Sequence, residues 1–236
     1  MARCYGGPKG RGPMSANEST SGPNQRIGTG RLDGFSDGVI AIAITLLVLE
    51  IAVHPPGTPL EQFLHAWPSY AGYVVSFLTI GAAWLGHSDL TNRLTRSDPI
   101  FLRINLLFLL AVTFLPFPTR LVAEGLHDRD AERVAVTIYG LTMLAIRVLL
   151  IALDGYARRV PLYSVQTEGE ELRAVQRRSL VAVICYVLVI LLGLVLPRLA
   201  VALYFGLAVY LVLPSRHVVA RLRSQPSGPA KPPAGA

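Results

Sequence analysis

Six long apolar stretches, separated by short polar or charged segments, dominate the pattern of hydrophobic and polar positions. They cover residues 32–53, 63–87, 103–122, 134–153, 180–196 and 199–219. An α-helix needs about 20 apolar residues to cross a bilayer, and most of these stretches approach that length. Membrane-spanning β-strands alternate strictly between apolar and polar positions, whereas these stretches do not. The pattern therefore predicts an all-α integral membrane protein with six transmembrane helices.

The segments around these stretches carry weaker signals. Only Pro197 and Arg198 separate the fifth and sixth stretches, which indicates a tight hairpin. The charged segment 155–178 is expected to be a solvated connector. Both ends of the chain are rich in Gly, Pro, Ser or Ala and lack an apolar core, as in disordered tails. The expected organisation is a disordered cytoplasmic tail, a six-helix transmembrane domain and a second disordered cytoplasmic tail, at residues 1–30, 31–222 and 223–236.

Composition supports a membrane protein and weakens the alternatives. Of the 236 residues, 52% are hydrophobic and 16% are charged, whereas soluble domains have about 25% charged residues. The two cysteines, Cys4 and Cys185, lack the spacing of a disulfide framework or a metal site. The net charge of +7 is also typical of nucleic-acid-binding proteins, but here the arginines are scattered among apolar stretches. We expect no nucleic-acid partner, no cofactor and no bound metal.

Lysines and arginines are distributed unequally between the two ends of the predicted helices. If the N-terminus is cytoplasmic, 17 basic residues lie in cytoplasmic segments and 4 in external ones. Since cytoplasmic loops carry an excess of Lys and Arg, both termini are expected in the cytoplasm of a multi-pass protein of the cell membrane. Arg147 lies inside the fourth stretch, where snorkelling to the surface and pairing with a carboxylate are both open.

The beginning of the first stretch is unusual for a membrane helix. Phe35, Ser36 and Asp37 follow Arg31 closely, and Asp37 lies roughly 9 Å from Arg31 along a helix. A carboxylate at this depth is costly unless it is paired or hydrated. This segment is therefore the first place to search for function.

An apolar face runs along the same helix. Ile42, Leu46 and Leu49 fall within about 60° of one another on a helical wheel, and Phe35 extends this face. Asp37 lies about 140° from Ile42, on the opposite side. From the residues alone, this apolar face would be assigned to lipid contact or to packing in a bundle.

The segment resembles the transmembrane protein 175 family of lysosomal and prokaryotic potassium channels. That family has an R-x-x-x-F-S-D motif on its first helix, and Arg31, Phe35, Ser36 and Asp37 match it completely. The resemblance covers about residues 31–220, with further support from Ser76-Phe77-Leu78, Trp84-Leu-Gly-His87, Asn105-Leu-Leu-Phe and Leu115-Pro-Phe-Pro118. One departure is Ser88, where many relatives carry a second histidine.

The resemblance implies a homotetrameric channel, selective for K⁺ and weakly discriminating against Na⁺, with a pore formed by the first helices. Ile42, Leu46 and Leu49 match the positions of the family's apolar pore layers. Thr45 matches a position where some relatives place a hydroxyl near the pore. Glu50 is expected either to contribute to a ring of carboxylates at the external mouth or to be a solvated helix end.

The remaining motif residues are expected to support the pore helix rather than to touch ions. We expect a buried polar cluster of Arg31, Asp37, Trp84 and His87. Phe35 and Ser36 belong to the same supporting group. The expected partners are further copies of the chain, the lipid bilayer and permeant K⁺ ions.

The residues leave one variant of the channel open and disfavour two other function classes. A proton-permeable channel is an open variant of the same pore. A proton-coupled secondary transporter is disfavoured because residues 31–122 and 134–220 show no convincing internal repeat. A membrane enzyme is disfavoured because no H-E-x-x-H or nucleophile pattern occurs and the histidines lack metal-ligand spacing.

Overall fold

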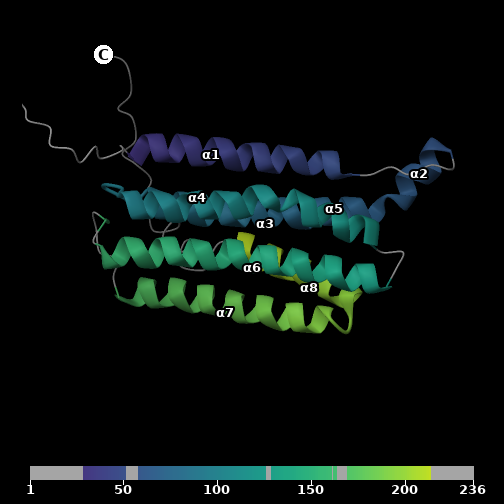
Figure 1. The fold of residues 1–236 in the computed structure, drawn as a ribbon. Helices are drawn as coiled ribbons and strands as arrows, with labels where there is room; N and C mark the ends of the chain where they lie inside the picture. The colour runs from purple at the N-terminus through teal and green to yellow at the C-terminus, as the bar shows by residue number, and fades with distance from the viewer. Residues whose placement is uncertain (1–28, 52–57, 126–128, 161, 164–168, 214–236) are drawn as a thin grey trace, which may run out of the picture.

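The computed structural model describes residues 29–51, 58–125, 129–160, 162–163 and 169–213. The helices of this part lie side by side with roughly parallel axes, α1 at one edge of the bundle and α7 at the opposite edge (Figure 1). The elements in chain order are α1 (Thr29–Leu46), the 3₁₀ helix η1 (Leu47–Glu50), α2 (Pro59–His65), α3 (Trp67–Thr91), α4 (Pro99–Phe114), α5 (Pro116–Glu124), α6 (Arg129–Arg159), α7 (Gly169–Gly193) and α8 (Pro197–Val212).

The all-helical prediction is confirmed, and the described part contains one isolated β-bridge, between Leu94 and Tyr163, in addition to the helices. Five helical stretches are long and apolar enough to cross a membrane. They are Thr29–Glu50, Trp67–Thr91, Pro99–Glu124, Asp130–Arg159 and Gln176–Gly193. The sixth predicted helix corresponds to α8, a shorter apolar helix of 16 residues. The last residues predicted for it, 214–219, and the two predicted tails apart from residues 29 and 30 lie outside the described residues.

Proline interrupts two of the predicted helices. The second stretch is divided at Ala66 into α2 and α3, just before Trp67 and Pro68. The third is divided at Leu115 into α4 and α5, just before Pro116. Proline has no N–H to donate and its ring collides with the preceding turn, so the helix restarts with proline in its first turn.

The expected connector at residues 155–178 is largely helical instead. Helix α6 continues to Arg159 and α7 already begins at Gly169. Within α6, Arg158 Nε donates to Asp154 Oδ2 over 2.8 Å, one turn apart, and this partly buried pair stabilises the end of the helix. Hydropathy locates the membrane-spanning part of a helix but does not detect a polar extension of the same helix beyond the membrane. The tight hairpin is confirmed. Helix α7 ends at Gly193, α8 begins at Pro197, and the two helices contact each other.

Helix α3 lies inside the bundle and contacts α1, α5, α6 and α8. A buried hydroxyl network joins three of these helices. Ser76 Oγ on α3 lies 2.7 Å from Thr119 Oγ1 on α5 and 2.9 Å from Tyr139 Oη on α6. Because hydroxyl groups satisfy one another here, the bundle interior holds polar atoms without exposing them to lipid. The network holds α3 in place, and α3 is one of the helices on which α1 packs.

Candidate functional site

Helix α1 has one buried face and contacts only part of the bundle. The buried residues recur every three or four positions, as one face of a helix requires: Leu32, Ser36, Ile40, Ala43 and, in η1, Leu47. This face packs against α3 and α4. Figure 1 shows α1 at the edge of the bundle, so its opposite face meets none of the described helices.

The exposed face of α1 contains the apolar residues that sequence analysis selected. The side chains of Ile42, Leu46 and Leu49 are 60%, 44% and 74% exposed, and Phe35 near the start of the helix is also exposed. In a bilayer, exposed apolar residues by themselves indicate only contact with lipid or with another protein surface. What distinguishes this helix is that two polar contacts, one on its buried face and one exposed, hold it against the bundle.

Two polar residues lie towards the C-terminal end of this segment, one in α1 and one in η1. Thr45 is exposed, and its Oγ1 donates to the carbonyl of Ile42 over 2.8 Å. Its proton is therefore engaged within the helix, while lone pairs of the oxygen still face outward. Glu50 ends η1, is partly buried, and lies close enough to Arg120 on α5 for the two charges to interact.

The first polar contact lies beneath α1 and is fully buried. Asn105 Nδ2 on α4 donates to Ser36 Oγ over 3.0 Å, and Asn105 Oδ1 lies 2.8 Å from His87 Nε2 on α3. Since this amide oxygen can only accept, the bond requires a proton on His87 Nε2. The His87 ring stacks on Phe108, with centroids 5.2 Å apart. Asn105 thus joins three helices at one point.

The second polar contact lies on the exposed side of α1. Trp84 Nε1 on α3 donates to Asp37 Oδ1 over 2.9 Å. Both side chains are exposed in the single chain. The contact gives the carboxylate of Asp37 a partner at a depth where an unpaired charge is costly.

The expected single cluster of four residues is therefore two separate contacts, and Arg31 belongs to neither. Asp37 pairs with Trp84, whereas His87 pairs with Asn105. Arg31 is exposed and forms no ion pair with Asp37. Six residues rotate a helix by about 240° and advance it by roughly 9 Å, so Arg31 and Asp37 point in different directions.

Sequence reasoning did not assign a supporting role to Asn105 or Phe108. Both lie in a long apolar run on α4, and both are buried. The signal that identifies Asn105 is an amide inside a membrane-spanning segment, because such groups almost always have a partner in the bundle. The sequence does not reveal that Asn105 has two partners, Ser36 on α1 and His87 on α3.

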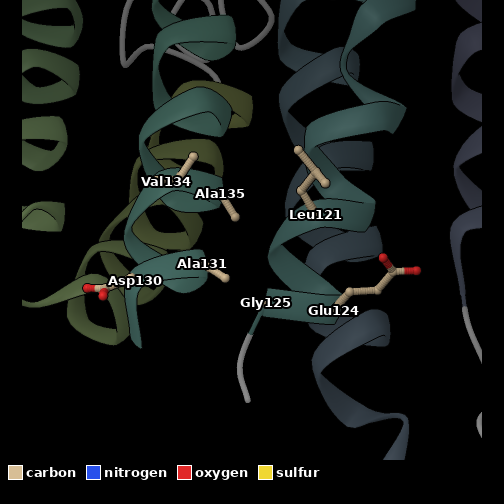
Figure 2. Close-up of a pocket in the computed structure, with 7 residues that line it drawn as sticks. All are labelled: Leu121, Glu124, Gly125, Asp130, Ala131, Val134 and Ala135. Carbon is tan, nitrogen blue, oxygen red and sulfur yellow. The ribbon is translucent and has the colours of Figure 1, made fainter. Parts of the chain in front are cut away.

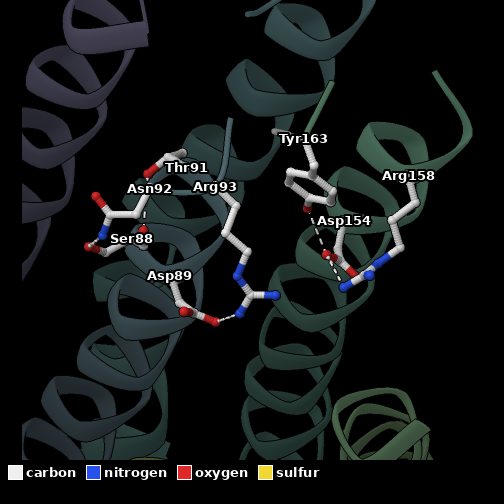
Figure 3. Close-up of polar contacts among 8 residues, drawn as sticks. All are labelled: Ser88, Asp89, Thr91, Asn92, Arg93, Asp154, Arg158 and Tyr163. Carbon is white, nitrogen blue, oxygen red and sulfur yellow. Dashed lines mark hydrogen bonds and ion pairs between the residues drawn. The ribbon is translucent and has the colours of Figure 1, made fainter. Parts of the chain in front are cut away.

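Another polar group fixes the end of the bundle at which α3 and α6 finish (Figure 3). Tyr163 Oη donates to Asp154 Oδ1 over 2.7 Å, and the Arg158 guanidinium lies over the Tyr163 ring at 5.5 Å from its centroid. Burial and the bond to the Asp154 carboxylate raise the pKa of Tyr163 above its usual value. At the end of α3, Arg93 pairs with Asp89. These contacts stabilise the ends of α3 and α6. None of them involves the exposed face of α1.

A depression of about 590 Å³ lies at the opposite end, between α5 and α6. Figure 2 shows its lining side chains, which are mainly alanine, valine and leucine. Its two carboxylates are engaged, because Glu124 pairs with Arg120 at 2.8 Å and Asp130 with Arg133 at 3.7 Å. In the described ranges no three or more His, Cys, Asp or Glu side chains gather as metal ligands would. The exposed face of α1 is therefore the better candidate site.

Fold and site together define a multi-pass helical membrane protein whose first helix is fixed on one side and offers an apolar face on the other. Comparison with known proteins identifies the family. A family model described as "Endosomal/lysosomal potassium channel TMEM175" matches residues 31–116. A potassium channel of Streptomyces collinus is 38% identical over 186 residues, covering 77% of this chain and 90% of the relative. The chain belongs to the TMEM175 family.

A solved structure and a more distant relative extend the comparison. The crystal structure of "a lysosomal potassium-selective channel TMEM175 homolog" from Chamaesiphon minutus superposes with a TM-score of 0.68 at 36% identity. It matches 78% of this chain and 95% of that one. An endosomal/lysosomal proton channel TMEM175 of Danio rerio is 30% identical over 148 residues, which are 58% of this chain and 28% of the relative.

Proposed function

We propose that this protein is a passive, potassium-selective cation channel, formed by four copies of the chain in the cell membrane with both termini in the cytoplasm. The first helices line the pore, and Ile42, Leu46 and Leu49 form its apolar constriction. The relatives support K⁺ as the permeant ion, since those sharing most of this chain's length are named potassium channels. The unequal distribution of basic residues supports the orientation.

One observation carries the proposal for the pore. Helix α1 packs on α3 and α4 through one face only, and the opposite face is exposed and, from Phe35 to Leu49 in η1, mainly apolar. One chain supplies one such helix, which cannot enclose a pore alone. Several copies facing a common axis give stacked rings of branched side chains, with Ile42 roughly 16 Å from Arg31 along the helix and so near the bilayer centre.

Selectivity follows from the cost of removing water. A cation entering a narrow apolar ring loses part of its hydration shell, which is unfavourable in an apolar medium. K⁺ holds its water less tightly than Na⁺, so the same ring hinders Na⁺ more. Apolar constrictions also gate conduction by dewetting. No protein carbonyl needs to replace the water, and discrimination is therefore weak.

The two polar residues of the outer half fit this path. With its proton bound to the Ile42 carbonyl, Thr45 offers oxygen lone pairs to a cation next to the apolar rings. Glu50 at the end of η1 adds negative charge at the mouth, which raises the local concentration of cations. We assign to Thr45 a role in partial rehydration and to Glu50 a role in attraction. Neither group provides covalent chemistry, and we assign no enzymatic activity.

The test is ion flux into proteoliposomes that contain only this protein. The wild type is expected to conduct K⁺ better than Na⁺. Replacing Ile42 by Asn should wet the constriction. If the barrier falls by about 1.4 kcal/mol, flux rises about tenfold, and the ratio of K⁺ to Na⁺ flux falls towards one.

Two control variants locate the effect. Leu110→Asn places the same amide on an exposed position of α4, away from α1, and should leave flux and selectivity unchanged. Ile44→Asn changes a partly buried position of α1 that packs on the core, and should lower stability rather than raise flux. A folded Ile42→Asn protein with wild-type flux and selectivity would show that this face does not line the pore.

The proton-permeable alternative is favoured by the relative from Danio rerio, which is named a proton channel. Flux measurements with the same vesicles distinguish a K⁺ channel from a proton channel. A pH gradient without K⁺ should produce little current if K⁺ is the main permeant ion. Dominant proton flux would replace the ion in this proposal, and absence of flux under every gradient would remove the channel itself.

A further inference from the structure

Arg147 is a charged side chain within the apolar stretch of α6. It lies 12 residues before the end of that helix at Arg159, about 18 Å along its axis. Its Nη2 donates to Ser179 Oγ on α7 over 3.3 Å, while its Nε is buried and has no acceptor among the described residues. A guanidinium at such a position is costly unless its donors are used.

A second guanidinium lies nearby on α7. Arg178 Nη2 donates to three carbonyls at the end of α8, those of Tyr210 at 2.7 Å, Leu211 at 3.0 Å and Leu213 at 2.7 Å. This places a cation at the negative end of the α8 dipole. Arg178 and Arg147 are close enough for each charge to act on the other.

Neither arginine has an acidic partner in the part of the chain that the structure describes. No carboxylate oxygen of that part lies within ion-pair distance of Arg147 or Arg178. The phenols of Tyr186 and Tyr210 also lie near enough to Arg147 to interact with its charge. Two cations that repel each other therefore lie near one another between α6, α7 and α8, and Arg147 Nε is an unused N–H donor. An anion would relieve the repulsion and use that donor.

We propose that the phosphate of a membrane phospholipid binds between Arg147 and Arg178. The planar fork of arginine matches phosphate oxygens well. The apolar part of α7 begins at Leu180, directly after Ser179, so the site lies at the membrane end of that helix. This depth suits a lipid headgroup.

The surface next to the site suits the tails of such a lipid. From one residue after Ser179, α7 exposes an apolar stripe with a spacing of four residues, formed by Leu180, Ile184 and Leu188. Acyl chains can lie along this stripe while the headgroup stays at the arginines. A free phosphate ion would gain nothing from it, so a lipid is the occupant that both features fit.

The proposal is tested by thermal unfolding of delipidated, detergent-purified protein, followed by tryptophan fluorescence. The probes are phosphatidylglycerol in mixed micelles and inorganic phosphate. At a lipid concentration of 100 times Kd the wild-type midpoint should rise by roughly 5–10 °C. Inorganic phosphate should cause no comparable rise.

Two variants test whether Arg147 binds the lipid phosphate. Arg147→Met should lose most of the lipid-induced rise, while its lipid-free midpoint is unchanged or higher because an unpaired buried charge is gone. Arg103→Met removes an exposed charge of α4 and should keep the full rise. If Arg147→Met fails to fold, Arg147→Lys takes its place, since it keeps the charge but lacks the Nε donor, and a smaller rise than wild type is expected.

Three results would overturn the proposal. The first is a full lipid-induced rise in Arg147→Met or, in its place, Arg147→Lys. The second is an equal loss of the rise in Arg103→Met, which would indicate diffuse attraction of anionic lipid. The third is a rise of the same size with inorganic phosphate alone, which would indicate a simple anion site.

Discussion

Replacing Asn105 by Leu should destabilise the protein, because this amide joins α1, α3 and α4. Leucine has a similar volume but leaves the Ser36 hydroxyl and the His87 Nε2–H buried without partners. A buried group that loses its partner costs about 1–3 kcal/mol in soluble proteins. Interhelical hydrogen bonds in membrane bundles average about 0.6 kcal/mol and reach about 1.7 kcal/mol. The lower range applies here, so two bonds amount to about 1–3 kcal/mol.

For a chain of this size, each kcal/mol shifts the unfolding midpoint by about 2–4 °C. The Asn105→Leu midpoint should therefore lie roughly 2–12 °C below wild type in the same detergent. Thr113→Val on the same helix is the matched control. Its hydroxyl donates only to carbonyls of α4 itself, at 3.0 and 3.1 Å, so its loss should leave the midpoint nearly unchanged.

A double-mutant cycle with Ser36→Ala tests the geometry directly. Ser36→Ala removes the acceptor of Asn105 Nδ2, and Asn105→Leu removes the donor of the same bond. The double variant should therefore be more stable than the sum of the two losses predicts, by an interaction energy of about 0.5–1.7 kcal/mol. Strict additivity, or an Asn105→Leu midpoint equal to that of the wild type, would refute the claim that this contact holds α1 in place.

Three further predictions use the same unfolding assay. Gly140→Ala should cost about 1–3 kcal/mol, because the new methyl would lie 2.7 Å from Ile190 Cγ1 and 2.8 Å from Tyr204 Cζ, whereas Gly81→Ala meets nothing within 4 Å; equal midpoints of the two variants would contradict this. Trp84→Phe should lower the midpoint by roughly 1–4 °C by removing the donor to Asp37, and no change would mean that water serves Asp37 equally well. Since the pKa of Tyr163 is raised in the fold, its stabilising effect should be complete below about pH 10 and decline above it; the gap between wild type and Tyr163→Phe should narrow from pH 8 to pH 11, and a constant gap would argue against it.

The positions of the membrane-spanning helices followed from hydropathy, because lipid forces every spanning segment to be both apolar and helical. Where helices end or break is decided by more local chemistry. Ala66 and Leu115 mark breaks caused by the prolines that follow them. The polar extensions of α6 and α7 could not be seen in hydropathy, because outside the membrane a helix needs no apolar residues.

The candidate site was predictable in part. The free apolar face was visible on a helical wheel, since three residues of the stripe share one direction. The joint role of Asn105 was not, because it depends on how closely α1, α3 and α4 approach one another. The separation of Arg31 from Asp37 was within reach of the sequence, since six residues place them on different sides of a helix.

Three consecutive residues of α1 have three different environments, and this explains why Phe35, Ser36 and Asp37 must be contiguous. Successive positions of a helix are rotated by about 100°. Phe35 is exposed on the free face, Ser36 reaches Asn105 in the interior, and Asp37 reaches the exposed Trp84 of α3. Two polar contacts in one turn fix both the depth and the rotation of α1, which apolar packing alone would leave free to slide. In a pore built from this helix, that rotation decides which side chains face the ion, so the motif can govern permeation without touching the permeant ion.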